Sequence, residues 1–93
     1  MQITIGRIVA YKISAEEAFI INDRRRTVVD ADNEPIYRGN QAGGSEEFPL
    51  LVTKVWSDGS INGQLFLDGN DSLWIASSTE GIGPHTWRWP NRD

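Results

Sequence analysis

The stretch that decides the fold is Phe48–Leu67, which reads FPLLVTKVWSDGSINGQLFL. On each side of Asp58 and Gly59, apolar residues occupy every second position, as in β-strands that bury one face. An Asp-Gly pair between two such runs is the strongest short-range signal for a tight hairpin. We therefore predict an antiparallel hairpin here, in which Gly59 adopts a positive φ angle.

The pattern continues toward the C-terminus. Turn-forming residues at Asp68–Asp71 precede a third alternating run, Ser72–Ser77, and Thr86–Trp89 forms a short closing run after a loop. Residues 48–89 are thus predicted to form a β meander.

The N-terminal part predicts one strand followed by one helix. Residues 7–13 alternate and are rich in β-branched side chains, as strands are. Ser14 and Glu17 then form the pattern of a capping box, which predicts a helix over residues 15–25. The helix is expected to point three of its apolar positions at the core: Ala18, Ile21, and either Phe19 or Ile20.

Residues 27–47 have the composition of a long irregular loop, in which Val28-Val29 and Ile36-Tyr37 can form a short edge pairing. The predicted fold class is a single domain over residues 1–93, mainly β with one helix (α+β), in the order β-α-loop-β-β-β-β. Strands this short and bent close into a small SH3-like barrel or form a strongly bent antiparallel meander. In the barrel, the first strand completes the sheet and the helix covers one open end.

Composition limits how such a chain is stabilised. A protein of 93 residues has a thin core, and with no cysteine and a single histidine it offers neither disulfides nor a structural zinc site. We therefore predict a homo-oligomer that needs no metal or cofactor. No apolar run is long enough to span a membrane and no signal peptide is apparent, so we expect a cytoplasmic protein without a membrane partner.

The net charge of −4 comes from residues 46–93, because basic and acidic side chains balance in the first 45 residues. An acidic C-terminal half disfavours binding of long nucleic acids, whose affinity depends on neutralising phosphates. A small nucleotide held by a few arginines stays compatible with this charge.

All four tryptophans lie at or after residue 56. A domain this small cannot hide every indole, and exposed indoles stack on flat ligands or anchor partners. The candidate ligand-binding residues combine indoles, amides that can read a base edge, and guanidinium groups that can bind phosphate: Trp74, Trp87, Trp89, Asn62, Gln64, Arg24, Arg25 and Arg88.

Structural roles compete with each of these interpretations. Trp87 and Trp89 can instead cover the barrel end and fill an oligomer interface. The run Arg24–Arg26 can be a solvated helix end, where positive charge suits the helix dipole. For catalysis, His85 has only Asp71 or Glu80 as conceivable partners and is more simply solvated, so we predict that the protein is not an enzyme.

Several segments, taken in order, resemble a family of small proteins encoded by tailed bacteriophages and prophages. The most distinctive are Leu67–Asp71, which reads LDGND, and Trp87–Pro90, which reads WRWP. The family has no assigned activity, so the resemblance implies a phage accessory protein in the host cytosol. By analogy of size and origin, we expect a small-ligand-binding protein, an oligomeric sponge that sequesters a nucleotide-type immune signal of the host. The alternative is a protein-interaction or virion-associated SH3-like module.

Overall fold

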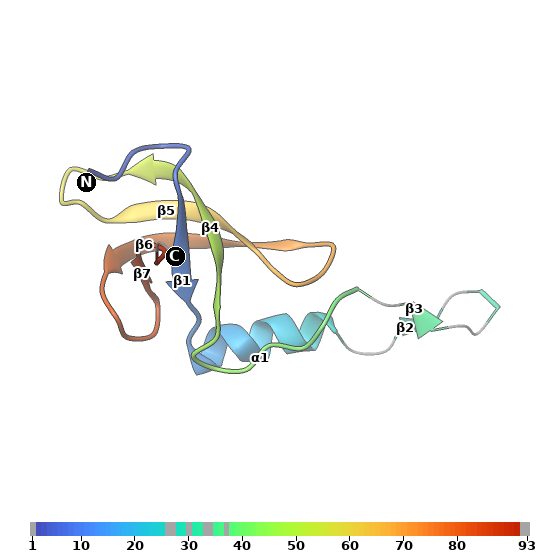
Figure 1. The fold of residues 1–93 in the computed structure, drawn as a ribbon. Helices are drawn as coiled ribbons and strands as arrows, with labels where there is room; N and C mark the ends of the chain where they lie inside the picture. The colour runs from blue at the N-terminus through green and yellow to red at the C-terminus, as the bar shows by residue number, and fades with distance from the viewer. Residues whose placement is uncertain (1, 26–27, 30, 33–34, 37, 92–93) are drawn as a thin grey trace.

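The computed structural model describes residues 2–25, 28–29, 31–32, 35–36 and 38–91. These residues form one helix and seven strands, shown in Figure 1: β1 (Ile8–Lys12), α1 (Ala15–Arg24), β2 (Val28–Val29), β3 (Pro35–Ile36), β4 (Glu47–Val55), β5 (Ile61–Phe66), β6 (Ser72–Glu80) and β7 (Thr86–Arg88).

Five strands form a closed barrel in the order β1-β4-β5-β6-β7, and β1 completes it by pairing with both β4 and β7. The predicted fold class is therefore confirmed: the protein is mainly β with one helix, and its barrel is of the small SH3-like kind. All neighbouring strands are antiparallel except β6 and β7, which run parallel where Thr79 faces Thr86. β7 thus pairs parallel to β6 and antiparallel to β1, which differs from the meander that the sequence predicted over residues 48–89.

The barrel interior is filled by the alternating apolar residues of every strand: Val9, Tyr11, Leu50, Val52, Ile61, Leu65, Ile75 and Trp87 are buried, and Ile13 and Leu67 continue this core. The alternation in β4 changes after Val52, where the register with β5 shifts at a β-bulge before Lys54. A bulge places two residues opposite one, so the inward face moves by one position. Val55 therefore packs on the core, whereas Lys54 and Trp56 are exposed, in contrast to the unbroken alternation that the sequence predicted.

The turn between β4 and β5 is tight, as predicted. Gly59 has a φ of 90° and its amide donates to the Trp56 carbonyl over 2.9 Å. The Asp58 carboxylate accepts hydrogen bonds from both the amide and the hydroxyl of Ser60, which fixes the conformation of the turn.

Helix α1 begins with both hydrogen bonds of the capping box. The Ser14 hydroxyl accepts from the Glu17 amide, and the Glu17 carboxylate accepts from the Ser14 amide. Ala18 and Ile21 are buried, but Phe19 and Ile20 are exposed, because only a narrow stripe of this short helix meets the barrel. Figure 1 shows α1 at the end of the barrel where β1 ends and β4 begins.

Strands β2 and β3 form a separate two-stranded sheet that projects from the barrel beyond the end of α1 (Figure 1). Val28 pairs with Ile36, as predicted, and Val29 with Pro35. Arg26 and Tyr37, which the sequence analysis placed at the helix end and in this pairing, lie outside the described residues. The predicted loop also contains a β-bridge between Gly39 and Gly69, which ties the base of the projection to the β5–β6 turn.

Candidate functional site

The strongest candidate site lies on the outer surface of β5 and β6. Gln64 faces Trp74 across the two strands, and Phe66 faces Ser72, so these four side chains share one face. They point outward because the intervening Leu65 points into the core. Trp74 is 60% exposed and Phe66 is 45% exposed. Diagonal neighbours on an antiparallel pair are within reach of aromatic side chains, so the two rings form a surface with polar groups at its other corners. We call Gln64, Phe66, Ser72 and Trp74 the platform.

Helix α1 supports one edge of the platform. Nη1 of Arg24 donates to the Ser72 carbonyl over 2.8 Å and to the Asp71 carboxylate over 3.2 Å. The Ser72 hydroxyl in turn donates to Oε1 of Gln64 over 3.3 Å. The C-terminal turn of α1, the start of β6 and the amide on β5 are thus linked in one chain of contacts. Arg24 retains 36% exposure of its side chain beside the platform.

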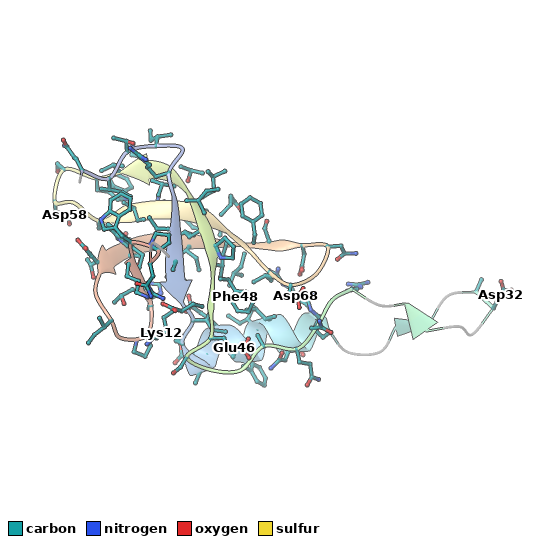
Figure 2. The ribbon with its side chains drawn as sticks, viewed as in Figure 1. Lys12, Asp32, Glu46, Phe48, Asp58 and Asp68 are labelled. Atoms are coloured by element: carbon teal, nitrogen blue, oxygen red, sulfur yellow. The ribbon has the colours of Figure 1, made fainter. Side chains whose placement is uncertain are left out.

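An open hollow of about 370 Å³ adjoins the platform, and the β5–β6 turn lines it: Phe66, Leu67, Gly69, Asn70, Asp71 and Ser72. Figure 2 labels Asp68, which begins this turn, close to the end of α1. Hydrogen bonds from Arg25 hold the pKa of Asp71 below its usual range against the opposing effect of burial, and Arg24 contributes in the same direction. Asp71 therefore stays ionised and bound to the two arginines.

Arg25 occupies a structural position rather than the candidate site. Its side chain is only 2% exposed, and it donates from Nη1 and Nη2 to Asp71 and from Nε to the Asn40 carbonyl. It lies beneath the Gly39–Gly69 bridge, where a Cβ on Gly69 would come within 2.7 Å of Nη2. A guanidinium group enclosed in this way has no free face for a phosphate.

Trp87 and Trp89 do come together, but toward the core. Trp87 is 3% exposed, and its ring meets that of Trp89 edge to face, with centroids 5.6 Å apart. Trp89 is partly buried against the same core cluster. β7 is a strand of the barrel, and its Trp87 side chain is buried in the core. Trp87 is therefore not part of the candidate site, which corrects the prediction that it stacks on a ligand.

Asn62 is buried as well, although it lies on the face of β5 opposite Ile61 and Leu65, at the point where β6 carries one extra residue between Ile75 and Ser78. Its Oδ1 accepts hydrogen bonds from Nε1 of Trp56 and from the Ser77 amide. Asn62 is therefore a buried link between two strands, and only Gln64 of the two predicted amides faces outward beside an indole.

Arg88 is bound elsewhere on the barrel. Its Nε and Nη2 form a bidentate contact with Glu47, at 2.6 and 2.7 Å. This contact lowers the pKa of Glu47 and raises the pKa of Arg88. Of the residues predicted for the site, the structure thus brings Trp74, Gln64 and Arg24 together, and it places the others in structural contacts.

The structure shows a second cluster of functional groups, which the sequence analysis did not predict. The Tyr11 hydroxyl donates to Oε2 of Glu17 over 2.5 Å, and Nδ1 of His85 lies 2.5 Å from the same hydroxyl and 3.2 Å from Oε2. Burial, followed by the contact with Glu17, raises the pKa of Tyr11. Burial alone would raise the pKa of Glu17, but its bonds with Tyr11, the Ser14 amide and His85 lower it overall.

This geometry fixes the orientation of the imidazole. The Tyr11 hydroxyl donates its single proton to Glu17, so a hydrogen bond between this hydroxyl and His85 is one in which Nδ1 donates to the hydroxyl oxygen. The ring borders an open hollow of about 590 Å³ at the start of α1. Acid–base catalysis uses carboxylate-oriented imidazoles, but here Glu17 also caps the helix. These contacts hold the β6–β7 loop on α1, and the His85 side chain keeps 49% of its surface exposed, in keeping with the solvated histidine that we expected.

Among the residues that the structure describes, no group of three or more histidine or acidic side chains could hold a metal ion, and no helix is long and apolar enough to cross a bilayer. In comparisons with known proteins, no family model, curated protein or solved structure matches the chain.

Proposed function

We propose that this protein binds a small, flat, nucleotide-type ligand on the platform and acts by sequestering it rather than by converting it. The observation that carries the proposal is Trp74, which lies 60% exposed on a rigid sheet directly opposite the Gln64 amide. A large exposed indole is costly to leave in water and gains most from a stacked ring.

The groups around Trp74 fit the parts of a nucleotide. The rings of Trp74 and Phe66 offer stacking surfaces, and Gln64 can hydrogen-bond the edge of a base. Arg24 is the accessible cation at the platform edge, since Arg25 is enclosed. The adjoining hollow is lined by both polar and apolar groups and has room for a sugar. We propose that the ligand is a host immune signal of this class and that the protein which binds it is a phage accessory protein.

The proposal is tested by calorimetry with purine and pyrimidine nucleotides, cyclic dinucleotides and cyclic ADP-ribose. Replacing Trp74 by alanine should weaken binding about ten- to a hundredfold, since stacking contributes on the order of 1–3 kcal/mol per base. Phe19→Ala is the matched control, because Phe19 is an exposed aromatic residue on α1 with no place in the platform. No binding by the wild type, or equal losses in both variants, would remove the proposal.

A separate observation favours protein binding as a second candidate. An open hollow of about 300 Å³ lies between β1, β4 and the C-terminal segment, with an almost wholly apolar lining of Ile8, Val9, Ala10, Phe48, Pro49 and Pro90 beside Glu47. It has the size and polarity to take one large apolar side chain from a peptide of a partner protein. A photo-crosslinking residue at Ile8 should then capture one protein that the same residue at Phe19 does not, and the purified pair should bind in solution.

A further inference from the structure

The orientation of the Gln64 amide bears on which ligand edge the platform accepts. Its Oε1 already accepts a hydrogen bond from the Ser72 hydroxyl. Ser72 is itself held in place, because its carbonyl accepts from Arg24 over 2.8 Å. Among the hydrogen bonds between described residues, none uses Nε2 of Gln64. The amide therefore presents N–H donors to a ligand that lies on Trp74.

The other polar groups at this edge of the platform are either hydrogen-bond donors or acceptors that already receive hydrogen bonds within the protein. Arg24 can only donate. The Asp71 carboxylate, the nearest strong acceptor, receives Arg25 on Oδ1 and both Arg24 and Arg25 on Oδ2. A ligand edge that carries donors finds few free acceptors here, whereas an edge that carries acceptors finds several donors.

This distribution distinguishes the purine bases. Guanine presents two neighbouring acceptors, N7 and O6, where adenine presents one acceptor and an amino donor. The usual contact of a glutamine side chain with adenine uses both its oxygen and its nitrogen. Ser72 uses one lone pair of that oxygen and holds it toward the start of β6, so the contact with adenine has only the second lone pair available, in an orientation that the Ser72 bond already sets.

We infer that the platform prefers a ligand whose stacked ring presents adjacent hydrogen-bond acceptors, a guanine-type base, over an adenine-type base. The inference rests on the proposed function, since it concerns which nucleotide the same platform takes.

Calorimetry with GMP and AMP, and with cyclic di-GMP and cyclic di-AMP, tests the preference. The wild type should bind the guanine member of each pair about tenfold more tightly. Ser72→Ala removes the donor that occupies Oε1, so the amide can turn toward adenine, and the ratio should fall toward one mainly through tighter binding of the adenine member. Phe19→Ala should keep the wild-type ratio.

Gln64→Glu gives an independent test, because a carboxylate accepts from the adenine amino group and repels guanine O6. The preference should then reverse. Equal binding of both bases by the wild type, with both lost in Trp74→Ala, would overturn the inference and leave the proposed function standing. Absence of binding for all four nucleotides would overturn the inference, and the proposed function is overturned too if pyrimidine nucleotides and cyclic ADP-ribose also fail to bind.

Discussion

At the scale of single residues, Trp74 and Trp87 show how position decides the role of one side-chain type. Trp74 lies on the outer face of β6, whereas Trp87 in β7 fills the barrel and contacts Trp89 edge to face. The indole of Trp87 is therefore part of the stability of the fold, and that of Trp74 is available for a ligand.

Replacing these two residues by alanine should have unequal effects on stability. Trp87→Ala leaves a large cavity and should lower the free energy of unfolding by about 3–5 kcal/mol. Trp74→Ala removes a mostly exposed ring and should change the free energy of unfolding by less than about 1 kcal/mol. Urea unfolding followed by circular dichroism measures both, and equal losses would contradict the placement of the two rings.

The turn residue Gly59 supplies a second prediction at this scale. Its φ of 90° is unfavourable for residues with a Cβ, although the space around it is open. Gly59→Val should cost about 1–2 kcal/mol from backbone strain alone. Gly59→Asn should cost less, because asparagine tolerates left-handed conformations. If both variants unfold at the same urea concentration, the strain argument fails.

At the scale of elements, the C-terminal turn of α1 is attached to the β5–β6 turn by two arginines that share Asp71. Arg25 is enclosed and uses three of its nitrogens in hydrogen bonds, whereas Arg24 is more exposed and uses one. The attachment of α1 to the sheet therefore depends mainly on Arg25.

Arg25→Ala should consequently destabilise the protein more than Arg24→Ala. Loss of the enclosed guanidinium leaves Asp71 with the Arg24 contact alone and removes the side-chain donor of the Asn40 carbonyl, which typically costs about 1–3 kcal/mol. The exposed contacts of Arg24 should contribute less than about 1 kcal/mol. Thermal unfolding of the two variants gives the order, and the reverse order would show that the exposed arginine holds the helix.

The contact of α1 with β1 and the β6–β7 loop depends on pH through Glu17. Its pKa in the folded protein lies below the ordinary value of 4.5. A lowered pKa adds stability that is present above the unfolded pKa and is lost as pH falls through the folded pKa. Stability should therefore decline below about pH 5, and more steeply than in Glu17→Gln. Chemical unfolding of both proteins between pH 7 and pH 3 tests this, and parallel curves would exclude Glu17 as a source of the decline.

At the scale of the whole molecule, a small barrel carries a two-stranded projection and several exposed apolar side chains: Ile5, Ile8, Phe19, Phe66, Trp74 and Ile82. An isolated two-stranded sheet is only marginally stable in water. Oligomerisation would cover such surfaces. Homo-oligomerisation, which we expected from the thin core, stays a prediction.

Light scattering after size exclusion should thus give a mass of at least twice 10.4 kDa at micromolar concentration. The physical reason is the apolar area, since each buried aromatic ring removes on the order of 150–250 Å² from water. A monodisperse monomer at high micromolar concentration would contradict it.

The sequence by itself determined the features that depend on residues close together in the chain. The Asp58-Gly59 turn, the capping box at Ser14 and the alternating strands each involve neighbours within a few positions. Together they predicted the fold class, a small barrel with one helix. Gln64 could also be assigned to the outer surface, because alternation places it opposite inward residues, whereas for Trp74 the pattern left an outward position and a core position equally open.

Only the tertiary structure decided which of the remaining candidate residues reach the surface. Register shifts at Thr53 in β4 and between Ile75 and Ser78 in β6 move the inward face of these strands by one position, and a one-residue shift reverses which side chains are buried. Arg25 is enclosed by glycines that are distant in sequence, and Tyr11, Glu17 and His85 meet only when the barrel closes. These arrangements arise from packing between distant segments, for which local pattern carries no signal.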